Sequence, residues 1–227
     1  MATELPEPKP KERFSPYTPY CWPDGAEVCL EAAPGELPVN LTRLVQERQS
    51  RRAFAALPLP ALGHLLSLCC RANSWTKSPL GFEQQFRGVP SAGAIHPIHV
   101  LIQRERFDGW VRYDPIGHML KGVDESKASA NSARAFADEL VTTGAATLVA
   151  LVAEPGKTGA KYDHPESLVW RDAGVIVGAM AWTAEALGLN LCPLGTTGHH
   201  YVAQLGPEGA FVGMGMLLIG GRPALMP

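Results

Sequence analysis

The seven residues Thr147–Ala153 (TLVALVA) form a continuous apolar run with the length of one β-strand. A strand without polar alternation must be covered on both faces, because either face, if exposed, would leave apolar surface in water. The run therefore predicts a central strand with other elements packed above and below it. With 46% hydrophobic and 19% charged residues in a length of 227, the chain can build such a core within one sizeable domain.

The other predicted elements are short strands and helices without regular βαβ alternation. Strands are expected at 98–103, 110–113 and 211–219. Helices are expected from Asn40 to about 49, from Pro58 or Pro60 to about 72, at 133–140 and at 165–187. This order indicates an α+β sandwich of one sheet with helices packed over it.

The longest predicted helix, Pro165–Leu187, is apolar nearly all round. Pro165 and Glu166 suit its first turn, and Gly188 suits its C-terminal end. We expect it to be buried on every side, with its small residues Gly174, Gly178, Ala179 and Ala181 allowing close backbone packing. One domain of this size can hardly cover such a helix alone, so a homodimer is predicted.

Charge and the N-terminal segment limit the partners. Twenty basic and 22 acidic residues give a formal charge of −2, which provides no electrostatic footprint for nucleic acid or an anionic membrane. Residues 1–38 contain eight prolines and little periodicity, so we expect an extended arm over a surface or a partner subunit, followed by one domain at 39–227. The absence of an apolar signal segment and of any membrane-length run favours a cytoplasmic protein.

The most basic turn of the chain is Arg48-Gln49-Ser50-Arg51-Arg52, at the end of a predicted helix. One guanidinium can donate to two phosphate oxygens at once, and a serine hydroxyl adds a short hydrogen bond. Arg48, Ser50 and Arg52 are therefore candidate phosphate ligands. A solvated basic turn without a ligand is the alternative, and the segment alone favours it.

Two segments of small residues could let a backbone lie against a flat ligand. The first contains Pro90, Ser91, Ala92 and Gly93 and continues to Pro97, and the second, Leu191–Gly198, contains Pro193, Leu194 and Gly195. For the first, an ordinary tight loop is the better interpretation from the residues alone.

Lys161 and Tyr162 precede the long helix. A lysine near a cofactor can act as a general base when desolvation or a nearby cation lowers its pKa, although an exposed loop lysine is the more common case. A metal site at His164, His199 and His200 is disfavoured because adjacent histidines seldom point at one ion, so no metal is expected. The five cysteines contain no CxxC and suggest reduced thiols rather than disulfides.

Taken in order, these segments resemble the nitroreductase superfamily, and within it the SagB-type dehydrogenases, which include enzymes that oxidise azolines to azoles. Arg48-x-Ser50-x-Arg52-x-Phe54 is similar to the family's FMN-phosphate motif, and Pro90–Pro97 to its Pro-Ser-(Gly/Ala)-Gly-Ala-x-x-Pro signature. Further similarities are spread over residues 40 to 223: Tyr113-Asp114-Pro115, His118-x-Leu120, Arg171–Gly174, Ala184–Leu189 and Cys192–Gly195.

The resemblance implies a nitroreductase-like sandwich with a mostly antiparallel sheet, a homodimer, and FMN at the subunit interface, with the Pro90–Ala94 loop supplied by the partner. It also implies that the amide near Gly195 faces the flavin, that Arg222 assists at the phosphate, and that Lys161 and Tyr162 are the catalytic base and its neighbour. The segment Asp163–Ser167 and Val175 depart from the azoline dehydrogenase pattern.

Three functions remain open at this point. The first is an FMN-dependent dehydrogenase acting on a small-molecule, peptide or carrier-bound substrate such as an azoline. The second is an NAD(P)H-dependent nitro or quinone reductase, which needs no Lys161. The third is a catalytically degenerate flavin-binding subunit that works with partner proteins in a biosynthetic complex.

Overall fold

The central feature of the fold is a seven-stranded sheet in which every pair of neighbours runs antiparallel. The computed structural model describes residues 6–23, 25–104 and 107–224. In spatial order the strands are β10 (Leu189–Pro193), β11 (Val212–Gly221), β8 (Thr147–Ala153), β5 (Ile98–Gln103), β6 (Val111–Asp114), β7 (Met119–Gly122) and β2 (Glu27–Cys29). The predicted α+β architecture with a mostly antiparallel sheet is confirmed.

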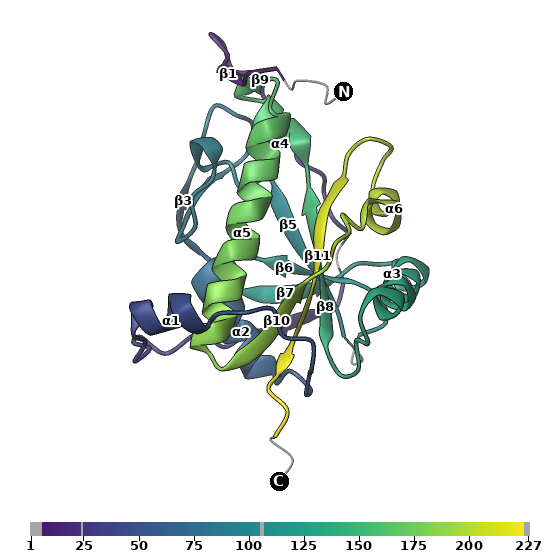
Figure 1. Ribbon diagram of the computed structural model, residues 1–227. Helices are drawn as coiled ribbons and strands as arrows, with labels where there is room; N and C mark the ends of the chain where they lie inside the picture. Colours follow the sequence, from purple (N-terminus) through teal and green to yellow (C-terminus); the bar gives the residue numbers. More distant parts are fainter. Residues whose placement is uncertain (1–5, 24, 105–106, 225–227) are drawn as a thin grey trace.

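Strand β8 lies inside the sheet and is buried along its whole length, as its apolar run predicts. Its side chains alternate between two cores: Val149 and Leu151 face one, and Leu148 and Ala150 face the other. The first core is covered by α2 (Leu59–Cys69) and α5 (Glu166–Ala186), and the second by α3 (Lys127–Leu140) and α6 (His199–Val202). Figure 1 shows α5 on one side of the sheet and α3 and α6 on the other.

Smaller elements surround these layers. They are α1 (Leu41–Glu47), the hairpin of β3 (Ala72–Thr76) and β4 (Gln84–Arg87), the 3₁₀ turns Ala92–Ala94 and Ala203–Leu205, α4 (Pro155–Gly159), and β1 (Lys9–Pro10) paired with β9 (Tyr162–Asp163). The Asn40 side chain accepts a hydrogen bond from the backbone of Arg43, so it caps α1 as expected.

Several elements differ from the prediction for physical reasons. The helix expected at 133–140 begins at Lys127, because Ser129 and Ala130 also pack into the core. The segment 191–198, in which no strand was expected, begins as strand β10, which exists because Leu189–Pro193 pairs with the distant β11. The β3–β4 hairpin and β7 were not predicted, since neither carries a clear alternation of apolar and polar residues.

The prediction that the long helix is buried on every side is wrong for one chain. Only one side of α5 packs on the sheet, while Trp170 and Trp182 are 47% and 52% exposed. Along the same helix, a Cβ added at Gly174 or Gly178 would meet no atom within 4 Å. The helix lies on one face of the sheet, and no further layer of the described chain covers it, so its outer side stays open.

The N-terminal segment runs along the domain rather than away from it. Tyr17 and Tyr20 both bind the buried carboxylate of Glu154, through a hydroxyl and a backbone N–H respectively. β2 then completes one edge of the main sheet. Residues 1–5 and 24 of the predicted arm lie outside the described residues, and contact with a partner subunit stays a prediction.

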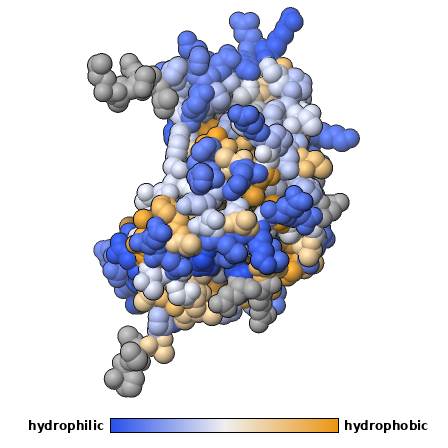
Figure 2. Space-filling view, turned by 90° about the vertical axis from the view of Figure 1, so that its right-hand side faces the viewer, coloured by the Kyte–Doolittle hydropathy of each residue, from blue (hydrophilic) through white to orange (hydrophobic). Residues whose placement is uncertain are grey.

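The face that carries α3 and α6 is mostly hydrophilic, with apolar residues in small separate areas (Figure 2). Among the described residues, no helix is long and apolar enough to cross a bilayer.

Candidate functional site

The basic turn predicted to bind phosphate follows α1 directly. The backbone N–H of Arg48 closes the helix on Leu44 O, 3.0 Å away. Two hydrogen bonds tie the next residues to β10: Arg51 N to Leu191 O at 3.1 Å, and the Asn190 amide to Ala53 O at 2.7 Å. The turn is therefore held at the open edge of the main sheet.

Within the described chain, the side chains of Arg48, Ser50 and Arg52 have no hydrogen bond or ion pair. Ser50 and Arg52 are exposed and Arg48 is half-buried. Two guanidiniums and a hydroxyl with unused donors at one turn form a suitable donor set for a phosphomonoester.

The other two arginines near this turn are engaged by Glu185, at the end of α5. Arg51 donates to one oxygen of this carboxylate, and Arg222 donates to the other at 2.6 Å. Burial alone would raise the pKa of Glu185, but the hydrogen bonds from Arg51 and Arg222 outweigh it and hold the pKa below its ordinary value. Arg222, which the resemblance assigned to phosphate, is committed to Glu185 in this chain.

The segment Pro193–Gly195 continues from the same edge strand. Leu194 donates its N–H to Met216 O at 2.8 Å, which keeps the backbone against β11. Gly195 is exposed, and a Cβ added to it would meet no atom within 4 Å. The arginine turn and Gly195 thus lie along one accessible edge.

The loop 90–97 is attached to α5 through the buried carboxylate of Asp172. Ser91 Oγ donates to one oxygen at 2.6 Å, and the N–H of Ala92 donates to the other at 3.1 Å. Ser91 Oγ in turn accepts from the N–H of His96 at 2.9 Å. Burial raises the pKa of Asp172, although these two hydrogen bonds act in the opposite direction. The Ser91 hydroxyl therefore uses its hydrogen bonds within the chain, where they hold the loop in place.

Lys161 and Tyr162 lie directly on this loop. Gly93 has φ +66°, and a Cβ added there would come within 3.0 Å of Lys161 Nζ and 3.1 Å of the Tyr162 hydroxyl. Both side chains are half-buried, and the ammonium lies 5.7 Å from the centre of the Tyr162 ring. Glycine is required here both by the backbone conformation and by this close approach.

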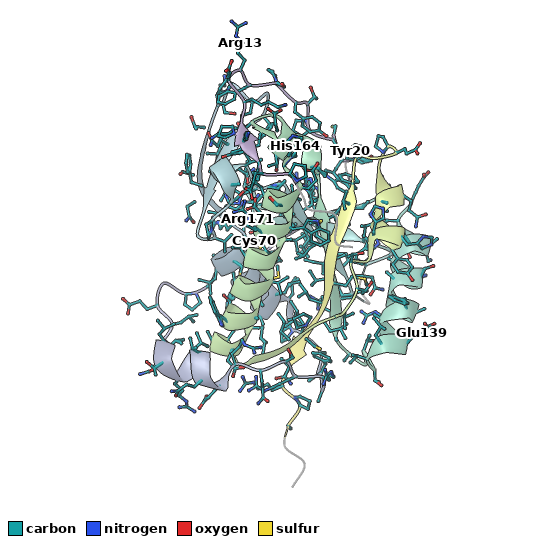
Figure 3. The ribbon with its side chains drawn as sticks, turned by 45° about the horizontal axis from the view of Figure 1, so that its top comes forward. Arg13, Tyr20, Cys70, Glu139, His164 and Arg171 are labelled. Atoms are coloured by element: carbon teal, nitrogen blue, oxygen red, sulfur yellow. The ribbon has the colours of Figure 1, made fainter. Side chains whose placement is uncertain are left out.

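The predicted site residues consequently form two groups at opposite ends of α5. The arginine turn lies at the Glu185 end, and the loop with Lys161 lies at the Asp172 end, about 20 Å away along the helix. In Figure 1, α1 is at the lower end of α5 and β9 is at the upper end. Figure 3 shows His164 and Arg171 at the upper end as well, far from Glu139 on α3.

Asp172 and Glu185 are residues that the sequence analysis did not single out. A signal existed, because an acidic residue in an otherwise apolar helix needs a partner when it is buried. The described residues contain no group of three or more His, Cys, Asp or Glu side chains that could hold a metal.

The fold is an α+β sandwich with helices on both faces of one antiparallel sheet, and the comparisons with known proteins agree with it. The nitroreductase family model matches residues 45–206. This chain belongs to the nitroreductase family. No curated protein matches its sequence.

Solved structures share the fold at low sequence identity. A nitroreductase-type protein from Ralstonia eutropha is 19% identical with a TM-score of 0.64, covering 93% of this chain and 99% of its own. The Escherichia coli microcin synthetase McbBCD complex, with truncated pro-MccB17 bound, is 15% identical with a TM-score of 0.56, covering 84% of this chain and 76% of its own. A Bacteroides fragilis nitroreductase with bound FMN is 13% identical with a TM-score of 0.50, covering 83% of this chain and 92% of its own.

Proposed function

We propose that this protein is an FMN-dependent oxidoreductase whose complete site needs two copies of the chain. The observation that carries the proposal is the arginine turn, where Arg48, Ser50 and Arg52 offer unused donors beside the open backbone at Gly195. Family membership and the FMN found in the Bacteroides fragilis relative support FMN as the ligand.

The residues fit this cofactor in kind. Arg48, Ser50 and Arg52 would hold the single phosphate, and no second phosphate-binding motif such as GxGxxG is present for a dinucleotide. Pro193–Gly195 would lie along the flat ring, since no side chain or neighbouring atom blocks Gly195. When bound, FMN supplies the capacity to exchange a hydride with a substrate.

The separation of the two groups along α5 argues for assembly from two chains. The outer side of α5 carries exposed Trp170 and Trp182 beside small residues, and it forms a surface on which a second copy can pack closely. In such a dimer the 90–94 loop of one chain would meet the arginine turn of the other. Because Lys161 and Tyr162 pack on Gly93, they would arrive with the loop, from the same chain.

Lys161 is proposed as the base that removes a proton as the substrate is oxidised, and Tyr162 as the group that orients it. The proposed substrate is a small molecule, a peptide or a carrier-bound intermediate, with an azoline as the specific candidate. The similarity to the microcin synthetase complex supports the peptide class and the possibility of biosynthetic partner proteins.

The first experiment is the visible spectrum of the purified protein and mass spectrometry of the released cofactor. A flavin spectrum with FMN mass is expected, and a protein that stays colourless after incubation with FMN would contradict the proposal. Stopped-flow reduction then separates the functions: reduction by an azoline supports the dehydrogenase, and reduction by NAD(P)H alone supports a nitro or quinone reductase. FMN that no donor reduces would indicate a degenerate subunit.

The second experiment tests the two-chain site by complementation. At low FMN concentration, Arg52→Ala and Lys161→Ala should each be inactive alone. The two variants are unfolded, mixed in equal amounts and refolded together, so that mixed dimers can form. Random pairing puts one intact site into each mixed dimer, so about a quarter of the wild-type activity should return. If both groups acted within one chain, the mixture would remain inactive.

A further inference from the structure

A second group of cations lies inside the protein, behind the 90–97 loop and away from the arginine turn. It surrounds a cavity of about 70 Å³ whose lining includes Gln85, Arg87, His96, His99, Arg112 and Lys157. These residues come from the β3–β4 hairpin, the loop, β5, β6 and α4, so five separate segments converge on one small space.

The charges around this cavity do not balance. Burial and the nearby Arg87 lower the pKa of His96 to about 3, and burial lowers that of His99 to about 4, so both rings are neutral at pH 7. Two carboxylates lie nearby: Glu154 accepts hydrogen bonds from the neutral groups of His99, Tyr17 and Tyr20, and Asp114 pairs with Lys121 and accepts from two backbone N–H groups. Three cationic side chains, Arg87, Arg112 and Lys157, therefore share the charge of Glu154 and part of that of Asp114, so positive charge is in excess.

The donors of these cations are incompletely used. The Nε of Arg112 is buried and has no hydrogen-bond partner in the described chain. Lys157 Nζ, on a side chain that is almost fully buried, donates one hydrogen bond, to His96 O at 3.1 Å. Arg87 donates two hydrogen bonds, from Nε and Nη2, to the neutral Gln85 Oε1. Buried positive charge in excess of its counter-charge is costly, and an unpaired buried donor usually indicates an ion or a water.

We propose that this cavity is a binding site for one small oxyanion, held by Arg87, Arg112 and Lys157. A volume of about 70 Å³ holds an ion of a few non-hydrogen atoms, since one water takes up ~30 Å³. Formate, sulfate and inorganic phosphate satisfy this chemistry, and a nucleotide or flavin does not fit. Gln85, Arg87 and Pro115 retain partial exposure, which gives the ion a route in.

The site would act on the loop in front of it. Lys157 holds the carbonyl of His96, and Gln84 donates to the carbonyl of Gly93 at 2.6 Å. Gln84 and Arg87 are both on β4. An anion that draws Lys157 and Arg87 together therefore braces both ends of the turn on which Lys161 lies. The proposed consequence is a more stable protein with a better ordered loop, whether or not FMN is bound.

The test is calorimetric titration of the purified protein with sodium formate, sulfate and phosphate, together with thermal unfolding at matched ionic strength in sodium chloride. We expect saturable binding of one anion per chain, and a rise in the unfolding temperature beyond that given by chloride. The absence of saturable binding for all three oxyanions in the wild-type protein would overturn the proposal.

Matched variants locate the site. Arg112→Gln should weaken binding at least ~10-fold, whereas Arg112→Lys, which keeps the charge, should lose only a few-fold. Lys127→Gln, at an exposed lysine on α3, should bind as the wild type does. Phosphate binding that is lost in Arg52→Ala but kept in Arg112→Gln would belong to the arginine turn and would refute the cavity site. If Arg112→Gln does not fold, the same three titrations are carried out on Arg52→Ala, whose cavity is intact. Saturable binding that persists there supports the cavity site, and its loss refutes it.

Discussion

The two ends of α5 use the same device for different purposes. At each end a buried carboxylate on the helix holds a segment that carries candidate site residues: Asp172 holds Ser91 and Ala92, and Glu185 holds Arg51 and Arg222. The donors differ, because a hydroxyl and an amide are neutral whereas guanidiniums are charged. The pKa of Asp172 is therefore raised by its burial, while that of Glu185 is lowered by its partners.

This difference indicates how each end can serve the site. The Glu185 end engages two of the nearby arginines and leaves Arg48 and Arg52 available for a ligand, so we expect it to determine cofactor affinity. The Asp172 end fixes a loop on which Lys161 and Tyr162 rest, so we expect it to determine turnover. The predictions below separate these two roles.

The largest expected effect is on chemistry at the Asp172 end. Lys161→Ala should lower turnover by roughly 100-fold or more, the usual contribution of a general base, and should leave FMN affinity unchanged. Steady-state kinetics with an accepted reduced substrate and a fluorescence titration with FMN measure the two quantities. Lys127→Ala, at an exposed lysine of α3, is the matched control. Wild-type turnover in Lys161→Ala would show that the lysine is not the base.

The next effect is on binding at the Glu185 end. Arg52→Ala should weaken FMN binding by about 1.5 kcal/mol or more, because it removes a charge-assisted hydrogen bond, and saturating FMN should restore turnover. Arg43→Ala is a suitable control, since Arg43 is an exposed arginine on the adjoining helix and pairs with Glu47. Equal affinities for the two variants would place the phosphate elsewhere.

A smaller effect concerns stability in acid. The folded-state pKa of Glu185 is lowered, so its contribution is present above its ordinary pKa and is lost as the pH falls through the folded value. Glu185→Gln should cost about 1.5–3 kcal/mol of unfolding free energy at pH 7, and less at pH 4. Urea unfolding at both pH values measures this, with the exposed Glu47→Gln as control. A cost independent of pH would mean that the ion pairs do not stabilise the fold.

The smallest effect has the opposite sign. The folded-state pKa of Asp172 is raised, so its favourable contribution is present below the ordinary pKa and is lost as the pH rises through the folded value. Asp172→Asn keeps the shape without the charge, and its stability relative to the wild type should improve by up to about 1 kcal/mol between pH 4 and pH 7. The same urea experiment measures it, and Asp108→Asn at an exposed position is the control. Parallel pH profiles for Asp172→Asn and Glu185→Gln would break the comparison between the two ends.

The elements that could be predicted are those whose signal is local. Thr147–Ala153 is a buried strand because its run of apolar side chains requires cover on both faces, and Asn40 starts a helix because its side chain can cap it. Candidate ligands at Arg48, Ser50 and Arg52 also followed from residue types alone. Strand β10 could not be predicted, since its pairing partner β11 lies more than ten residues further along the chain.

The sequence by itself determined the sheet core, the family resemblance, and which residue types could bind phosphate or act as a base. Only the tertiary structure decided which arginines are available: Arg51 and Arg222 look like Arg48 and Arg52 in sequence, yet Glu185 engages the first two. It also decided that Lys161 rests on Gly93, and that Arg87, Arg112 and Lys157 share one cavity. The physical reason is that the state of a charged side chain depends on burial and on partners that the fold brings from distant segments, which no local pattern of residues records.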